Sequence, residues 1–202
     1  MKSAELFWDD RHSKVKKDSI CGFYENGKYF TTYARTVEFL KIEEYVRSGI
    51  HALEIGVGMG IVTKEFHDRG LITSGLDISS KALSKVKSYC ENIYTINELH
   101  KIPSDYFDII ICNRVIQHVP TELMIKELTH CIASLKQAGV FALQFVSKGN
   151  VDDTGINASI RHVAAGTCYR SPEHLRKIIK DCGGTCELVF SENNNHVFHI
   201  RK

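Results

Sequence analysis

The sequence predicts an α/β fold in which helices cover both faces of a seven-stranded, mostly parallel sheet. Short apolar runs alternate with amphipathic helical stretches from residue 50 onward, which is typical of a parallel sheet. A glycine-rich segment, 56–60, follows the first apolar run directly. The last two apolar runs are separated by only a short polar turn, so they predict a hairpin and an antiparallel last strand. A chain of 202 residues is long enough for one such domain.

The N-terminal quarter predicts a helical segment that precedes the sheet. Residues 1–20 are polar and amphipathic, and we expect one helix over the mouth of the domain. Residues 21–30 contain two glycines and an asparagine and predict a loop with a turn. A second helix is expected from Thr31 or Thr32 to about residue 47, where Ser-Gly follows. We therefore divide the chain into an N-terminal helical lid, 1–48, and a main domain, 49–202.

The main domain begins with five apolar runs that alternate with helical stretches. Runs this apolar indicate strands that are buried on both faces. A short helix or irregular segment is expected between the third and fourth strands. The predicted elements are strand 50–55, helix 60–69, strand 71–76, helix 79–90, strand 92–96, strand 107–112, helix 121–136 and strand 140–146.

The C-terminal part predicts one helix and the closing hairpin. Ser171 and Pro172 form a capping residue and a first-turn proline, so a helix is expected over 172–182. Two strands, near 185–190 and 196–201, follow it. The stretch 147–170 lacks apolar periodicity and predicts a long functional loop.

The glycine-rich segment and the next strand end predict a nucleoside site. Glycines let the backbone pass close to a ligand, and Asp77, about 20 residues further on, can accept both ribose hydroxyls. The sixth position counted from Gly56 is Ile61 rather than glycine, which argues against a dinucleotide. No Gly-Lys-Ser/Thr follows, which argues against a phosphate-binding loop. The pattern favours a nucleoside without phosphate.

Four segments together resemble the class I S-adenosylmethionine-dependent methyltransferases, which have a Rossmann-like fold. The pattern acidic-x-Gly-x-Gly-x-Gly over 54–60 resembles the first motif of that family, and 75–79 resembles the second. Residues 96–103 resemble the third motif, and 107–119 resemble the fourth strand with its following turn. The resemblance is carried by motifs over 50–147 and beyond that by the order of elements.

The resemblance implies S-adenosyl-L-methionine as the cofactor and S-adenosyl-L-homocysteine as its product. It places Asp77 on the ribose diol, Ile78 against the adenine and Glu98 near the adenine amino group. Glu98 departs from the usual aspartate by one methylene. The implied cofactor-binding residues are Tyr33, Glu54, Gly56, Gly58, Gly60, Asp77, Ile78, Glu98, Leu99 and Asn113.

Residues beyond the carboxyl ends of the strands are candidates for binding the methyl acceptor. His118 is the candidate general base, because imidazole titrates near neutral pH; a structural histidine at a helix start is the alternative. Arginines suit an anionic acceptor through forked hydrogen bonds, although a solvated loop explains those of 147–170 equally well. The candidate substrate-binding residues are Tyr29, Arg114, Arg161 and Arg170.

These features predict a methyltransferase of small-molecule biosynthesis. The expected acceptor is an oxygen of a polar small molecule, either a sugar hydroxyl or a carboxylate, phosphonate or phosphate group. The alternatives are N-methylation of an amine or amino sugar, and a catalytically silent methyltransferase-like binding subunit. The fourth strand lacks the Asn-Pro-Pro-Tyr of many base and glutamine methyltransferases, since Cys-Asn-Arg-Val stands at 112–115.

Composition narrows the partners and the location. The net charge is only +2 and no basic patch is concentrated in the sequence, so we expect no nucleic acid partner. No apolar stretch reaches the ~20 residues of a membrane span. The seven cysteines are an odd number, which favours reduced thiols and a cytoplasmic location, and we expect no metal site. We expect a monomer or a homodimer acting on a small-molecule substrate.

Overall fold

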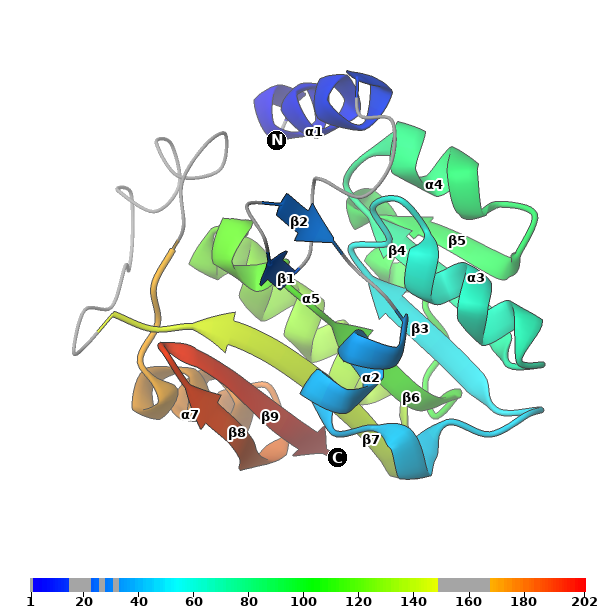
Figure 1. The fold of residues 1–202 in the computed structure, drawn as a ribbon. Coiled ribbons are helices and arrows are strands. Elements are labelled where there is room, and N and C mark those ends of the chain that lie inside the picture. Colours follow the sequence, from blue (N-terminus) through cyan, green and yellow to red (C-terminus); the bar gives the residue numbers. More distant parts are fainter. Residues whose placement is uncertain (1, 15–22, 26–27, 31–32, 149–167) are drawn as a thin grey trace.

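A computed structural model describes residues 2–14, 23–25, 28–30, 33–148 and 168–202. Its centre is a seven-stranded sheet in the order β5-β4-β3-β6-β7-β9-β8 (Figure 1). Strands β3 to β7 are parallel, and β9 lies antiparallel between β7 and β8, which confirms the predicted sheet and its antiparallel last strand. The strands are β3 (His51–Ile55), β4 (Ile72–Asp77), β5 (Cys90–Thr95), β6 (Phe107–Cys112), β7 (Leu135–Val146), β8 (Thr185–Glu192) and β9 (Asn195–Arg201).

Helices cover both faces of this sheet, as predicted. Helices α2 (Tyr33–Leu40) and α3 (Ile61–Asp68) share an apolar cluster with one face of β6, and α4 (Ser80–Val86) packs on the same side beneath β4. Helices α5 (Thr121–Ser134) and α7 (Pro172–Asp181) share the cluster on the opposite face. Every residue of β6 except Asp108 is buried, so this strand is the centre of the core.

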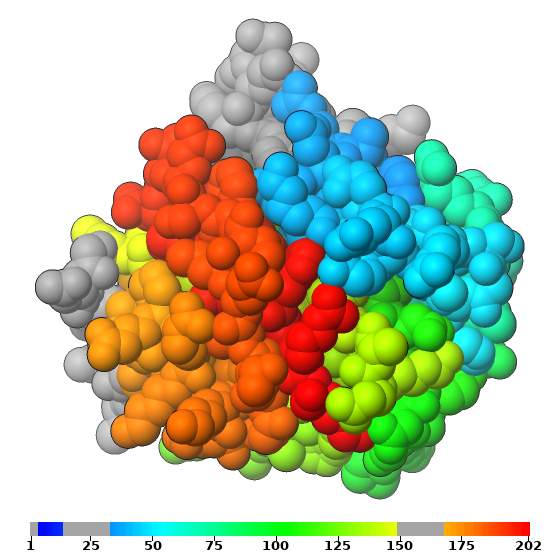
Figure 2. Space-filling model, turned by 90° about the horizontal axis from the view of Figure 1, so that it is seen from below, coloured from blue at the N-terminus to red at the C-terminus, as the bar shows by residue number. Residues whose placement is uncertain are grey.

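The two ends of the described chain lie at opposite ends of the parallel strands. Helix α1 (Lys2–Lys14) lies above the carboxyl ends of the strands (Figure 1). On the opposite side, the segment around α2 lies beside the red C-terminal strand β9 (Figure 2). There His199 bonds to the carbonyl of Leu40 at 2.8 Å, and the guanidinium of Arg201 donates to the Tyr45 hydroxyl at 2.8 Å.

The second helix is shorter than predicted, because its end is capped without glycine. It ends at Leu40, and Lys41 adopts a left-handed φ of 56°. The amide of Ile42 then donates to the carbonyl of Val37 at 3.1 Å, while both side chains are buried in the core. This is the Schellman arrangement. Only a short 3₁₀ turn, η1 (Glu43–Tyr45), follows.

Other boundaries also differ from the prediction. The helix expected over 79–90 ends at Val86, and the next strand begins at Cys90. The segment expected to be a loop contains a short antiparallel hairpin, β1 (Phe23–Glu25) with β2 (Lys28–Phe30). Strand β7 begins at Leu135, not at residue 140, because the chain enters the sheet directly after α5 and then shifts register beside β6. The first helix is described only to Lys14, and the remainder of its predicted span lies outside the described residues.

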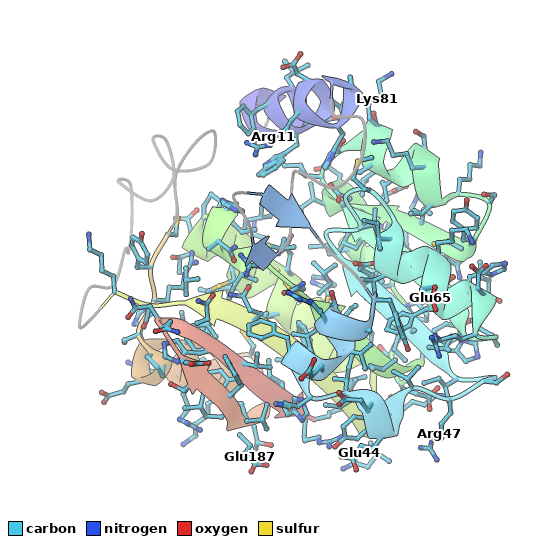
Figure 3. All side chains as sticks on the ribbon, viewed as in Figure 1. Arg11, Glu44, Arg47, Glu65, Lys81 and Glu187 are labelled. Carbon is cyan, nitrogen blue, oxygen red and sulfur yellow. The ribbon has the colours of Figure 1, made fainter. Side chains whose placement is uncertain are left out.

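Charged groups of both signs are distributed around the periphery. The side chains labelled in Figure 3, three basic and three acidic, lie on different elements around the fold. Within the described residues no helix is long and apolar enough to cross a membrane. Six cysteines in the described part of the chain are free thiols, and no group of three or more potential metal ligands occurs there. His196 and His199 lie on opposite faces of β9, as strand alternation predicts.

Candidate functional site

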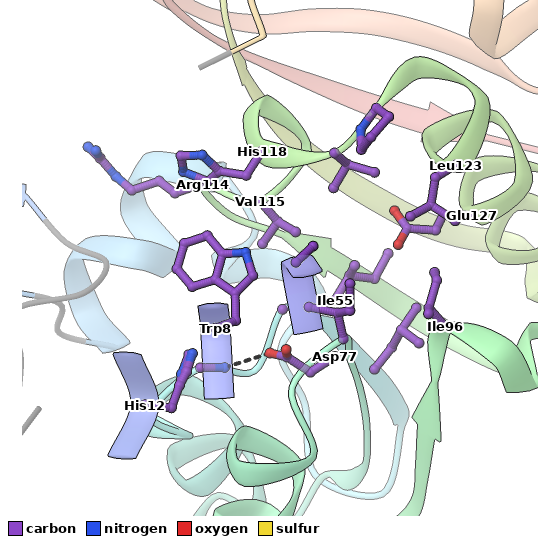
Figure 4. A pocket seen from close by; sticks show the side chains of 17 residues that line it. Trp8, His12, Ile55, Asp77, Ile96, Arg114, Val115, His118, Leu123 and Glu127 are labelled. Carbon is purple, nitrogen blue, oxygen red and sulfur yellow. Dashed lines mark hydrogen bonds between the residues drawn. The ribbon is translucent and has the colours of Figure 1, made fainter. Parts of the chain in front are cut away.

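A cavity lies beneath α1, at the carboxyl ends of β3, β4, β5 and β6 (Figure 4). This is the position at which open α/β sheets bind ligands. Its walls come from α1, the glycine turn, the ends of β4 and β5, the turn after β6 and helix α5. The lining residues are Ala4, Trp8, His12, Ile55, Gly56, Gly58, Leu76, Asp77, Ile78, Ile96, Arg114, Val115, His118, Val119, Pro120, Leu123 and Glu127.

The glycine turn has a backbone that other residues rarely adopt. Gly56, Gly58 and Gly60 have φ angles of 74°, 51° and 76°. A Cβ on Gly56 would lie 2.2 Å from Cγ2 of Val115, and one on Gly60 would lie 2.5 Å from Cγ1 of Val86. Gly58 has no such neighbour, since its nearest atoms are 3.9 Å away. The turn is therefore packed tightly on both flanks and open at Gly58, which faces the cavity.

Asp77 ends β4 with its carboxylate in the cavity. Its Oδ2 accepts a hydrogen bond from the amide of Gly58 at 3.1 Å, and its Oδ1 accepts one from the amide of Ser79 at 2.8 Å. The residue is 8% exposed, and burial raises the pKa of its carboxyl to about 6 despite these donors. Each oxygen keeps a further lone pair for a ligand, so Asp77 can accept two hydroxyl groups at once.

The remaining walls on this side are apolar. Ile55 and Leu76 form the floor, and Ile78 and Ile96 lie beside the ends of β4 and β5. A flat, uncharged base could lie among these side chains while its sugar meets Asp77. The site residues therefore suit an adenosyl group without phosphate.

Arg114 and His118 lie at the other end of the cavity, after β6. Arg114 has a left-handed φ of 59°, and its amide donates to the buried Gln144 side chain at 2.7 Å. The 3₁₀ turn η3 (Ile116–His118) follows. The ring of His118 lies 5.4 Å from that of Trp8 on α1, so a residue from the N-terminal helix completes this end (Figure 4).

Helix α1 is held on α4 by the carboxylate of Asp9 and by the ammonium of Lys85, which donates to the carbonyl of His12 at 2.9 Å. Asp9 accepts hydrogen bonds from the Ser79 hydroxyl at 2.6 Å, the Ser80 hydroxyl at 3.2 Å and the Lys81 amide at 3.1 Å. These bonds place Trp8 and His12 over the cavity. Burial, together with the nearby Lys85 ammonium, lowers the pKa of His12 to about 4, so its ring is neutral at pH 7.

Four candidates predicted from the sequence have other surroundings. Glu98 belongs to the capping box of η2 (Ile96–Lys101) and pairs with Lys101 at 2.7 Å. Tyr33 packs edge-on against Phe66, with the Arg69 guanidinium over its ring. Glu54 is buried beneath the turn and accepts from the Thr63 hydroxyl, and burial raises its pKa to about 8. Glu98, Tyr33 and Glu54 do not line the cavity. The fourth candidate, Arg170, does not line it either.

Arg170 lies in the core. It is 1% exposed, and its guanidinium donates to the carbonyls of Ile116 and Val119, at 2.8 and 2.7 Å, and to the Thr121 hydroxyl at 3.2 Å. The structure thus places this candidate beneath the His118 turn and not on the surface of a loop.

Leu99 is buried in the main apolar cluster, and Asn113 is half-buried beside the cavity residues. Neither lines the cavity. Arg161 and the side chain of Tyr29 lie outside the described residues. Gly60 closes the glycine turn without lining the cavity.

One functional candidate was missed by sequence reasoning. Glu127 lines the cavity from α5 and is 8% exposed. It stands between the core residues Met124 and Leu128, on the face of the helix that packs against the sheet. An acidic residue at an apolar position of a predicted helix was the available signal.

Comparison with known proteins agrees with this geometry. A family model described as a methyltransferase domain matches residues 26–188. A ubiquinone biosynthesis O-methyltransferase of Coxiella burnetii is 30% identical over 105 residues, which is 48% of this chain and 44% of that protein. The chain thus spans less than half the length of that relative. One of Bradyrhizobium is 24% identical over 218 residues, covering 98% of this chain and 81% of that protein.

Solved structures share the fold at low identity. The DhpI-SAM-HEP complex covers 100% of this chain and 97% of its own, with a TM-score of 0.65 and 16% identity. Magnesium protoporphyrin IX methyltransferase of Synechocystis PCC 6803 with bound SAH covers 84% of this chain and 81% of its own, with a TM-score of 0.59 and 17% identity. With the family model covering most of its length, the chain belongs to the S-adenosylmethionine-dependent methyltransferase family.

Proposed function

We propose that this protein transfers a methyl group from S-adenosyl-L-methionine to an oxygen atom of a polar small molecule. The leading acceptors are a sugar hydroxyl and an acidic group, either carboxylate, phosphonate or phosphate. The observation that carries this proposal is that Arg114 and His118 both line the same end of the cavity, away from Ile96.

The residues divide between cofactor and acceptor. Asp77 holds the ribose, Ile78 and Ile96 flank the base, and the turn at Gly58 lets the methionine part pass close to the backbone. S-adenosylmethionine, when bound, supplies a methyl group already activated by its positively charged sulfur. The protein then needs to align the acceptor and exclude water, and Trp8 and the apolar walls do the second.

Arg114 and His118 act on the acceptor. The guanidinium of Arg114 orients an acidic group by charge-assisted hydrogen bonds. For a hydroxyl acceptor, the imidazole of His118 takes the proton that leaves the oxygen. An acceptor that is already anionic needs no base, so the dependence on His118 distinguishes the two acceptor classes.

The relatives favour oxygen, whereas the fold itself does not select the acceptor atom. The curated relatives are named O-methyltransferases. A structure with the same fold and a TM-score of 0.60 is an N1-methyltransferase of Burkholderia thailandensis bound to 1,6-didemethyltoxoflavin. N-methylation of an amine or amino sugar is therefore the second candidate.

A panel of acceptors tests the proposal. Methyl transfer is measured with sugars, carboxylic acids, phosphonates, phosphates, phenols and amines. We expect turnover with an oxygen acceptor, and turnover of amines alone would overturn the oxygen assignment. With a hydroxyl acceptor, His118→Gln is expected to lower kcat about 100-fold and leave the KM for the cofactor unchanged. His100→Gln changes an exposed histidine of η2 and serves as the matched control.

We also propose that the N-terminal segment 1–48 acts as a lid over the bound cofactor. Because Asp9 supplies three hydrogen bonds between α1 and α4, Asp9→Ala is expected to raise amide exchange in α1 about fivefold to tenfold. Hydrogen exchange followed by mass spectrometry measures this, with Glu5→Ala on the same helix as the control. If exchange in α1 stays at the wild-type rate after Asp9→Ala, these bonds do not hold the helix.

A further inference from the structure

Glu127 is a buried carboxyl group with no partner among the described residues. It is 8% exposed, and no hydrogen bond or ion pair joins it to another described side chain or backbone group. Its carboxyl group points into the cavity beside Leu123 and Ile96 (Figure 4). Burying a polar group without a partner is costly, so a ligand is the natural partner for this one.

The order of the strands shows which part of a ligand Glu127 would meet. Arg114 and His118 follow β6, Asp77 ends β4, and Ile96 follows the edge strand β5. With the sugar on Asp77 and the reactive end toward β6, the base extends toward β5. Glu127 lies at that end of the cavity, opposite Arg114 and His118 (Figure 4).

We propose that the neutral carboxyl group of Glu127 reads the adenine of the cofactor through a pair of hydrogen bonds. This inference rests on the proposed function. The amino edge of adenine presents an N–H donor beside a ring nitrogen acceptor. A protonated carboxyl group presents one acceptor and one donor side by side, so the two edges are complementary. An ionised carboxylate would keep only the bond from the amino group.

The surroundings of Glu127 favour the neutral form. Burial, and then the nearby Asp77 carboxylate, raise the pKa of Glu127 to about 8. No cation of the described residues lowers this pKa. The titratable groups on the elements packed around it are Asp77 on β4, Glu54 on β3, Cys112 on β6, Cys131 on α5, Glu98 and Lys101 on η2, Arg114 and His118 after β6, and His12 on α1.

Glu127 would take the part that the family resemblance assigns to Glu98. The Oε2 atom of Glu98 is engaged by the amide and hydroxyl of Thr95, both at 3.0 Å, and its Oε1 by Lys101. Both oxygens are therefore bound within η2. The acid on α5 reaches the cavity from the other side.

Calorimetric titration with S-adenosyl-L-homocysteine at pH 7 and pH 9 tests the assignment. In the wild type, affinity is expected to fall about tenfold over this range, because a carboxyl group with a pKa of about 8 passes from mostly neutral to mostly ionised. Glu127→Gln keeps one donor and one acceptor at every pH, so it should bind like the wild type at pH 7 and lose this extra pH dependence. Glu127→Leu should bind about 10-fold to 100-fold more weakly at pH 7.

The controls separate this inference from the proposed function. Glu122→Gln alters an exposed acid on the same helix and should reproduce the wild type at both pH values. If the wild type binds and Glu127→Leu binds equally well, the role of Glu127 is refuted while the cofactor assignment stands. If Glu127→Gln retains the full pH dependence, another group titrates and the neutral-carboxyl reading is refuted. A wild-type protein without affinity for S-adenosylhomocysteine would refute the proposed function itself.

Discussion

Replacing Asp77 by alanine is expected to weaken binding of S-adenosyl-L-homocysteine by at least about 100-fold, since hydrogen bonds to a charged acceptor contribute about 1.5–3 kcal/mol each. The substitution removes both oxygens available to the ribose. It also frees the amides of Gly58 and Ser79, which the carboxylate now fixes at 3.1 and 2.8 Å. Asp77→Asn keeps one acceptor oxygen and should lie between alanine and the wild type. Isothermal titration calorimetry measures all three.

Asp108 provides a matched control for this experiment. Its carboxylate also accepts a backbone hydrogen bond, from the His51 amide at 2.9 Å, and it pairs with Lys136 at 2.8 Å. It lies near the amino-terminal end of β6, and the cavity lies at the carboxyl ends of the strands. Asp108→Ala should therefore leave the affinity unchanged. An Asp77→Ala protein that binds as tightly as the wild type would contradict the whole assignment of the site.

Gly56→Ala is expected to abolish measurable cofactor binding and to lower stability by about 2–5 kcal/mol, the sum of a strained backbone and an overpacked contact. The residue has a φ of 74°, and the added Cβ would lie 2.2 Å from Val115 Cγ2. Val115 lines the cavity next to Arg114, so relief of the clash by movement of this segment would deform the glycine turn and the Arg114 end of the site. Thermal unfolding gives the stability, and titration with S-adenosylhomocysteine gives the affinity.

Two further variants separate the clash from the backbone strain. Gly183 has a φ of 88°, and a Cβ added there would have no atom within 4 Å, so Gly183→Ala carries the strain alone and should preserve binding. Adding Val115→Ala to Gly56→Ala removes the closest atoms and should recover part of the lost stability. If Gly183→Ala impairs binding as strongly as Gly56→Ala, contact with Val115 is not the cause.

The sequence was sufficient for the sheet because its signals are local and repeated. The strands of the parallel part are rich in apolar residues, most clearly over Ile109–Cys112 of β6. Ser79 and Ser171 cap α4 and α7 through their side chains. The glycine turn and Asp77 could be paired because their spacing is set by one βαβ unit. These features need no knowledge of distant contacts.

Most differences from the prediction come from contacts that join distant parts of the chain. The end of α2 depends on burial of Ile42 in a cluster that includes Val140 and Val197. Arg170 was placed in a polar loop, but three acceptors near His118 draw it into the core. For Glu98 the contact is local, because the capping box at Thr95 engages its carboxylate, and its place near the adenine stays a prediction. Glu127 carried no recognisable motif, because its importance comes only from the cavity it faces.

The anchoring of Arg170 has a consequence for how this enzyme could change its acceptor. The amide of Cys168 donates to the carbonyl of Gln117 at 2.6 Å, and that of Arg170 donates to the carbonyl of Val146 at 3.2 Å. The chain that follows residues 149–167 is thus bonded both to the stretch that carries His118 and to the end of β7, which precedes residues 149–167. The sequence predicts that residues 149–167 form the acceptor loop. On that prediction, substitutions there would change acceptor specificity without removing the hydrogen bonds that Arg170 makes beneath His118, so selection could act on the loop without destabilising the fold.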